Sequence, residues 1–170
     1  SPMGFNCALE TLAHANRHKS GQIYYSWRII SEGGTHAVGW NGVTISCDGG
    51  LGPMSRDETL VVVGGEGIVA ATTPNVLNFL RREARKGIEV GAVSSAVYPL
   101  AKAGLLHEKH ATTHWEYHSS LSEMLLEVKI LDNIFNEDGK VFTCAGGASS
   151  MDLMLHRIAN DFGEELAFWV

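Results

Sequence analysis

The sequence predicts an α/β domain built on a parallel β-sheet with helices on both faces. Short, continuous apolar runs such as Thr59–Val63 and Ile88–Val93 are typical of parallel strands that are buried on both sides. Each run is followed by a segment with helical spacing, and this alternation favours parallel strands joined by crossover helices. At 170 residues, 45% hydrophobic and 19% charged, the chain is long enough for one domain with a sizeable core.

The first third of the chain predicts one helix and two strands. Apolar residues recur at helical spacing over Met3–His18. Aromatic and β-branched residues predict a strand over Ile23–Ser31, and a shorter strand is expected at Val43–Ser46. Glycine-rich turns at Gly33–Gly34 and Gly49–Pro53 separate these elements.

The rest of the chain continues the alternation. Further helices are expected at Pro74–Lys86, Ser95–Leu106, Trp115–Leu126, Ser149–Phe162 and Glu164–Val170. Strands are expected at Lys109–Thr113 and Lys140–Cys144, and the polar run Asn133–Gly139 predicts a turn.

The charge distribution limits the partners of these residues. A net charge of −6 disfavours nucleic-acid binding by this chain alone, because phosphate binding needs a basic face. One basic cluster stands out, formed by Arg81, Arg82, Arg85 and Lys86. We interpret it as the solvated face and C-terminal end of a helix, where cations complement the helix dipole, with a partner-binding patch as the alternative.

Cysteine spacing and hydropathy place further limits. Cys7, Cys47 and Cys144 show neither metal-site nor disulfide spacing, and each is expected to be a small buried residue. No apolar run reaches the roughly 18 residues that a membrane span needs, and no signal peptide is visible. The expected location is the cytoplasm.

Three segments should meet at one edge of the sheet. In an open parallel sheet, ligands bind at the carboxyl ends of the strands. Gly64-Gly65-Glu66, Ser94 and Thr113-His114-Trp115 each follow a predicted strand. We therefore expect them to line a common pocket, with Glu66 pointing into it and Tyr98 as a further wall.

Ser94 occupies a predicted sharp strand-to-helix turn, the position of a nucleophile in several hydrolase folds. A serine needs a general base to become nucleophilic, and His114 is the candidate base. Ser94 or Ser95 could instead cap the helix or hydrogen-bond a ligand. Spacing alone favours capping or ligand binding over attack.

A metal site is the weaker reading of the histidines. His110, His114 and His118 recur every four residues, but the first is predicted on a strand and the second at a strand–helix junction. No carboxylate stands at a supporting spacing, so neither a metal nor another cofactor is predicted.

Four stretches together resemble a known family: LETLAHANR (9–17), VGAVSSAVYPLAKAGLL (90–106), ATTHWEY (111–117) and DGKVFTCAGGASSMDLMLHRIANDFG (138–163). They resemble the effector-binding domain of GlxA-type AraC-family transcriptional regulators, within the PfpI and class I glutamine-amidotransferase-like superfamily. The resemblance covers nearly the whole chain, residues 1–170. It implies a flavodoxin-like parallel-sheet sandwich, with a pocket in which enzyme relatives keep a Cys at the elbow and a His at the position of His114.

The chain departs from the enzyme pattern. Ser94 stands where the nucleophilic Cys would be, and Gly4 falls where an acidic helper would sit. The resemblance therefore implies a ligand-sensing domain and not an enzyme. The expected ligand-binding residues are Gly65, Glu66, Ser94, Ser95, His114 and Trp115. The alternative is a PfpI-class hydrolase or hydratase that uses Ser94 and His114.

The resemblance also implies partners. Effectors of such regulators are often amino acids or quaternary amines, and the proteins are expected to form homodimers. DNA contact would belong to a C-terminal AraC-type helix-turn-helix domain, which these residues do not include. The family also has a strand before the first helix, and Ser1-Pro2 falls where that strand would end.

Overall fold

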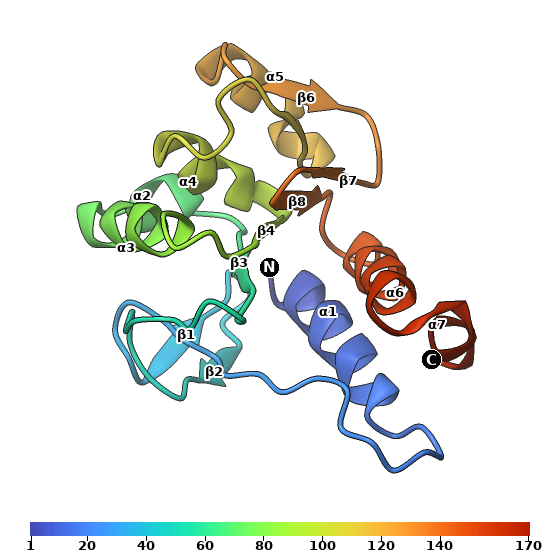
Figure 1. The fold of residues 1–170 in the computed structure, drawn as a ribbon. Coiled ribbons are helices and arrows are strands. Elements are labelled where there is room, and N and C mark those ends of the chain that lie inside the picture. The colour runs from blue at the N-terminus through green and yellow to red at the C-terminus, as the bar shows by residue number, and fades with distance from the viewer.

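A computed structural model describes residues 1–170, and a mixed, mostly parallel sheet lies at its centre (Figure 1). Its order is β3 (Leu60–Val63), β4 (Val90–Val93), β8 (Val141–Cys144) and β7 (Phe135–Asp138). The first three are parallel, and β7 runs antiparallel to β8. Two smaller sheets pair β5 (His110–Thr112) with β6 (Lys129–Leu131) in parallel, and β1 (His36–Val38) with β2 (Thr44–Ser46) antiparallel.

Helices cover both faces of this sheet. The two faces carry α1 (Pro2–Ala15) with α6 (Ser149–Phe162), and α3 (Pro74–Ala84) with α4 (Val97–Lys102). On β4, Val93 packs with residues of α1 and α6, whereas Val90 and Ala92 join the main core with α3 and α4. Side chains alternate along a strand, so a strand buried on both faces must be apolar throughout. The short elements are α2 (Ile68–Ala71), the 3-10 turn η1 (Ser94–Ala96), α5 (Trp115–Met124) and α7 (Glu164–Trp169).

Most of the predicted helices are confirmed. The helix at Ser149–Phe162 has the predicted bounds, and the one predicted from Pro74 begins there, with the Thr73 hydroxyl accepting from the Val76 amide at 3.2 Å. The helix predicted over Ser95–Leu106 is shorter: it opens with η1 and ends at Lys102. The strands β1 and β6 and the helix α2 were not predicted.

The strand predicted at Ile23–Ser31 is wrong. The segment forms only an isolated bridge, between Ile30 and Gly49. Upstream, the Asn16 side chain accepts from the amides of Tyr24 and Tyr25 and donates to the Tyr25 carbonyl. Aromatic and β-branched composition favours strands only where a partner strand completes the ladder, and here one side chain replaces the partner.

The turn predicted at Asn133–Gly139 is also wrong, and so is the expectation of an all-parallel sheet. Phe135–Asp138 forms β7, whose polar side chains hold the neighbouring strand β5. Asn136 Nδ2 donates to the His110 carbonyl at 3.0 Å, and Asp138 Oδ2 accepts from the His110 amide at 3.0 Å. A polar run at the sheet edge is therefore a strand that binds its neighbour through side chains.

The basic cluster does more than face solvent. Arg81 donates to the carbonyls of Lys102 and Ala103, and Lys86 Nζ lies 2.6 Å from the fully buried carboxylate of Glu83. Arg82 Nε also reaches Glu83, at 2.5 Å. The cluster fastens α3 to the surrounding loops. No helix of the structure combines the length and the apolar character needed to cross a membrane.

Candidate functional site

Ser94, the first residue of η1, forms a strained elbow directly after β4. Its φ is +63°, and Glu108 is the only other non-glycine residue with positive φ. This backbone region costs an L-residue about 1–2 kcal/mol. Ser94 is also only 3% exposed. Such strain persists where surrounding packing determines it, and it is concentrated at functional sites.

Two glycines let neighbouring backbone approach the elbow. A Cβ on Gly64, after β3, would lie 2.3 Å from the Ala96 nitrogen. A Cβ on Gly146, after β8, would lie 2.6 Å from the Ser94 Cβ. Three loops at the carboxyl ends of β3, β4 and β8 therefore close around one residue, as the sequence predicts for a ligand site in an open sheet.

The two elbow hydroxyls differ in their surroundings. Ser95, fully buried, donates its hydroxyl to the Gly65 carbonyl at 2.9 Å and ties the elbow to the loop after β3. The Ser94 hydroxyl has no protein hydrogen-bond partner, and it is not among the fully buried unpartnered oxygens. The hydroxyl that remains available to a ligand is that of Ser94.

His114 is connected to the elbow only indirectly. The neighbouring Thr113 hydroxyl donates to the Ser94 carbonyl at 3.0 Å. The His114 imidazole itself caps α5, with Nδ1 accepting from the Glu116 amide at 3.3 Å and lying 3.6 Å from the Glu116 carboxylate. No hydrogen bond joins His114 to the Ser94 hydroxyl, so the structure contains no assembled serine–histidine pair.

A buried thiol lies beneath the elbow. Cys144, at the end of β8, is fully buried, and its sulfur is 3.7 Å from the Ser150 hydroxyl. Burial raises the pKa of this thiol above its ordinary value, although hydrogen bonding to Ser150 opposes the rise. A raised pKa leaves little thiolate, the reactive form. The prediction of a buried cysteine is confirmed here, whereas Cys7 and Cys47 are half-buried.

Aromatic and acidic side chains gather at the start of α5, next to the Thr113 that bonds the elbow. The His114 ring lies 5.7 Å from the Trp115 ring and 6.1 Å from the Tyr117 ring. Burial raises the pKa of Tyr117, and the charges of Glu66 and Glu116 raise it further. Both carboxylates therefore contribute negative potential at Tyr117. We call Glu66, His114, Trp115, Glu116 and Tyr117 the acidic–aromatic rim.

Other predicted residues lie elsewhere or act separately. Tyr98 is packed in the main core, with Lys102 Nζ 5.6 Å from its ring centre. The three histidines that recur every four residues each have a different acidic neighbour. These neighbours are Asp138 for His110, Glu116 for His114 and Asp132 for His118. The three imidazoles do not converge on one point.

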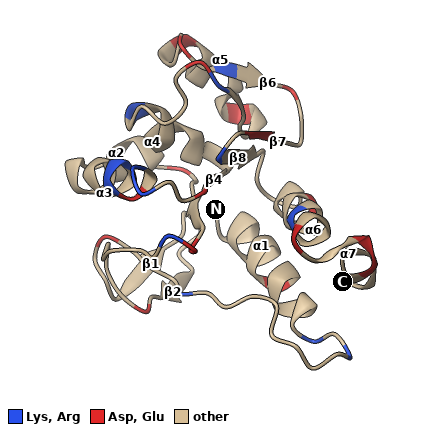
Figure 2. Ribbon diagram, viewed as in Figure 1, with Lys and Arg blue, Asp and Glu red and all other residues tan.

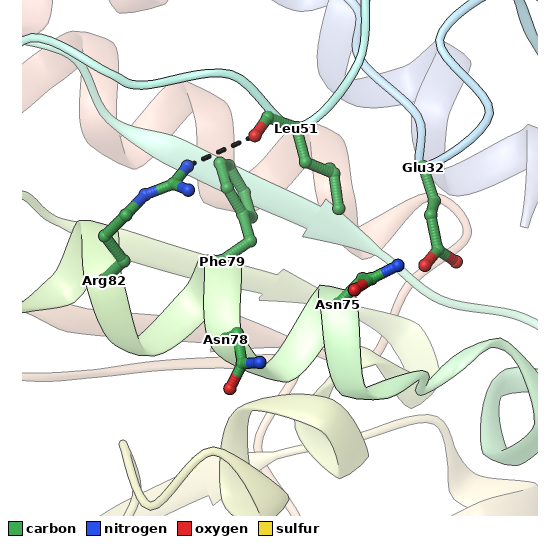
Figure 3. Close-up of a pocket in the computed structure, with 6 residues that line it drawn as sticks. All are labelled: Glu32, Leu51, Asn75, Asn78, Phe79 and Arg82. Carbon is green, nitrogen blue, oxygen red and sulfur yellow. Dashed lines mark hydrogen bonds between the residues drawn. The ribbon is translucent and has the colours of Figure 1, made fainter.

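A surface hollow of about 290 Å³ lies away from the elbow, on α3. Its lining is Glu32, Leu51, Asn75, Asn78, Phe79 and Arg82. Figure 3 shows Arg82 directed to the Leu51 carbonyl, a bond of 3.2 Å, beside the Phe79 ring. Arg82 therefore hydrogen-bonds the loop that follows Gly50. None of the predicted ligand-binding residues lines the hollow.

Comparisons with known proteins establish the family. The profile described as DJ-1/PfpI family matches residues 10–160. The chain belongs to the DJ-1/PfpI family. Its α/β fold is shared with Drosophila melanogaster DJ-1beta, whose structure has a TM-score of 0.78 at 23% identity, covering 99% of this chain and 88% of that one.

The curated relatives include transcriptional regulators. "HTH-type transcriptional regulator CdhR" of Pseudomonas aeruginosa is 36% identical over 170 residues, which is 100% of this chain and 50% of the relative. "HTH-type transcriptional regulator GlxA" of Rhizobium meliloti is 32% identical, covering 98% of this chain and 53% of the relative. The chain thus spans about half the length of these two regulators. Among solved structures, an "AraC family transcriptional regulator from Pseudomonas putida" shares its fold, with a TM-score of 0.80 at 22% identity over 99% of this chain and 90% of that one.

An enzyme is also related, over a shorter stretch. "Isonitrile hydratase" of Pseudomonas putida is 33% identical over 106 residues, 62% of this chain and 39% of the enzyme. The elbow at Ser94 was predicted from the sequence, whereas Tyr117 in the rim was not. The signal was present in the HWEY run, where an aromatic residue lies three positions after His114 and so returns to the same side of the helix.

Proposed function

We propose that this domain is the ligand-sensing part of a DNA-binding transcription regulator, and not an enzyme. The observation that carries the proposal is the Ser94 elbow. It keeps the strained backbone of a functional site, yet its side chain is a hydroxyl without a hydrogen-bonded base. Since an unactivated serine is a poor nucleophile, the elbow is suited to hydrogen-bond a ligand.

The rim indicates the ligand class. Carboxylates at Glu66 and Glu116 attract positive charge, and the ring faces of Trp115 and Tyr117 bind cations through their quadrupoles. A small metabolite with a positively charged nitrogen, such as an amino acid or a quaternary amine, fits this chemistry. Its polar end would reach the Ser94 hydroxyl.

The output of the domain follows from its relatives. DNA contact would be made by a helix-turn-helix segment outside these 170 residues, as the names and lengths of CdhR and GlxA suggest. The chain itself carries a net charge of −6, which disfavours binding to the phosphates of DNA. Ligand binding would act by shifting the population of domain arrangements.

A thermal-shift screen with free amino acids and quaternary ammonium carboxylates tests the proposal. A ligand present at 100 times its dissociation constant should stabilise the fold by about 2.7 kcal/mol. Glu66→Gln and Trp115→Ala should reduce the shift, whereas Glu123→Gln, on the same helix as Trp115, should not. The absence of a shift with every compound, or equal shifts in all variants, would refute the proposal.

The second candidate is a hydratase or hydrolase, favoured by the relation to isonitrile hydratase. It requires the Ser94 hydroxyl to attack with His114 as base. Turnover of an isonitrile, amide or ester by the purified chain, abolished by Ser94→Ala, would establish it.

A further inference from the structure

The basic cluster on α3 is only partly used by contacts within the chain. Arg82 and Lys86 pair with the buried carboxylate of Glu83, and both also donate to carbonyls of the preceding loop. Arg85, which caps the C-terminus of α3, is exposed. Two of the four cations therefore hold the fold together, and the placement of Arg81 and Arg85 needs a further reason.

Arg81 is held in place but keeps a free edge. Its Nε donates to the Ala103 carbonyl at 3.2 Å, and its Nη2 donates to the Lys102 carbonyl at 2.9 Å. Both bonds use the same edge of the planar guanidinium group, which also carries donors on its other edge. The outer edge, with Nη1, is free to pair with the two oxygens of a carboxylate.

These cations border a surface hollow of about 390 Å³ between α3 and the end of α4. Its lining is Arg81, Ala84, Arg85, Ala103 and Leu105. The hollow thus combines three apolar side chains with two guanidinium groups. Lys102, which is exposed next to Ala103, adds a third cation, and Figure 2 shows the blue of basic residues on both α3 and α4. We call the hollow, with Arg81, Arg85 and Lys102, the basic hollow.

No carboxylate of the chain pairs with these three cations. The Arg and Lys residues that form ion pairs are Arg28, Arg82, Lys86, Lys109 and Arg157. The C-terminal dipole of α3 favours nearby cations, but Arg81 and Arg85 are four residues apart on one helix, where like charges repel. The chain has 19 acidic and 13 basic residues, so three unpaired cations at one hollow run against its overall charge. They indicate a surface that meets negative charge from outside the chain.

The chemistry of the hollow favours an acidic protein segment over DNA. DNA-binding surfaces commonly neutralise about six to ten phosphates, which is more than three cations can do. The apolar lining contributes nothing to phosphate binding, whereas it can bury an apolar side chain. Guanidinium groups pair with carboxylates through two parallel N–H groups. A segment with several carboxylates and an apolar residue among them fits all of these features.

We propose that the basic hollow is a docking surface for an acidic segment of a partner protein. The carboxylates of the segment pair with Arg81, Arg85 and Lys102, and its apolar side chain packs on Leu105. The carbonyl bonds of Arg81 orient the guanidinium before the partner arrives, which lowers the entropic cost of binding. The hollow lies at the C-terminal end of α4, whereas Ser94 precedes the N-terminal end, so the surface is separate from the candidate ligand site.

The test is an NMR titration of the isotope-labelled, purified chain with a synthetic glutamate peptide that has leucine at every third position. Shifts should be confined to residues of α3, α4 and the loop after α4. The double variant Arg85→Glu, Lys102→Glu should raise the dissociation constant of the peptide by at least about tenfold, because two attractive charges become repulsive. Both side chains are exposed, so the variant spectrum should otherwise match that of the unmodified chain.

The matched control is Arg17→Glu, which makes the same change of charge at an exposed residue after α1 and should leave the dissociation constant unchanged. A peptide with glutamine in place of glutamate should not bind, and one with serine in place of leucine should bind several-fold more weakly. Absence of shifts at the hollow, equal constants in the double variant and in Arg17→Glu, or the same shifts with inorganic phosphate or a short DNA duplex alone would overturn the proposal. None of these results involves the elbow, so they are separable from the proposed function.

Discussion

The elbow at Ser94 and the β1–β2 hairpin are both sharp reversals of the chain, and they are held by opposite means. At the elbow, Ser94 keeps positive φ because glycine-lined loops enclose it. At the β1–β2 hairpin, Trp40 in the turn is 67% exposed, and Gly39 beside it approaches Pro2 at the start of α1. The comparison teaches that a functional surface can be recognised by strain inside a packed framework. Such a surface suits a small ligand.

The largest effect should come from filling the space beside the elbow. In Gly64→Ala the new methyl would meet the backbone nitrogen of Ala96, which cannot move without shifting η1. We expect a loss of about 3 kcal/mol in the free energy of unfolding, measured by urea denaturation. Gly52→Ala, where a Cβ meets no atom within 4 Å, is the control. Equal stability of the two variants would show that the elbow is not tightly packed.

The stability of the fold should depend on pH through Asp138, which hydrogen-bonds the first residue of β5. Hydrogen bonding from the His110 amide and Lys109 lowers the pKa of Asp138 from 3.8 to about 2. A carboxyl with a lowered pKa stabilises the fold fully above its unfolded value and loses that contribution as the pH falls through the folded value. The stabilisation should therefore be complete above about pH 4 and disappear towards about pH 2.

Asp138→Asn tests this assignment. At neutral pH it should cost about 1.5 kcal/mol, allowing for solvent screening of a side chain that is 29% exposed. Melting temperatures of the two proteins should converge as the pH falls from about 4 to about 2. Parallel melting curves across that range would contradict the role given to Asp138.

A smaller effect should reveal the strain itself. Glycine adopts positive φ without penalty, whereas alanine at position 94 keeps the penalty. Ser94→Gly should therefore be more stable than Ser94→Ala by about 1 kcal/mol in urea denaturation. If alanine proves the more stable replacement, the elbow conformation is not costly and the comparison with the hairpin fails.

The smallest effect should be at the turn of the β1–β2 hairpin. Trp40→Ser removes an exposed ring, so the stability of the isolated monomer should change by no more than about 0.5 kcal/mol. Measurement under dilute conditions keeps dimerisation out of the result. A large loss would mean that Trp40 is packed within its own chain.

Local pattern was enough to predict the elements that bury an apolar face. The continuous apolar run over β4 and the spacing in α6 gave their types and nearly their bounds. Errors occurred where pairing decided the outcome. Ile23–Ser31 has strand composition but no ladder partner, and β7 has turn composition but pairs with β8. The residues of one segment do not by themselves show which other segment will pair with it in a sheet.

The candidate site shows the same limit. Sequence placed Ser94 at a strand-to-helix turn, and the structure supplies its positive φ and burial. Sequence could not show that Ser95 donates to Gly65 or that His114 Nδ1 accepts from the Glu116 amide, because both bonds depend on the placement of loops. These contacts distinguish a binding elbow from an assembled catalytic pair.

Isothermal titration calorimetry, with the compound that gives the largest thermal shift, tests the central claim most directly because it detects both binding and turnover. A recognition site predicts heat that saturates with ligand and leaves the compound intact, with weaker binding in Ser94→Ala. Sustained heat flow from a compound that is being consumed, and its loss in Ser94→Ala, would show that the Ser94 hydroxyl breaks bonds.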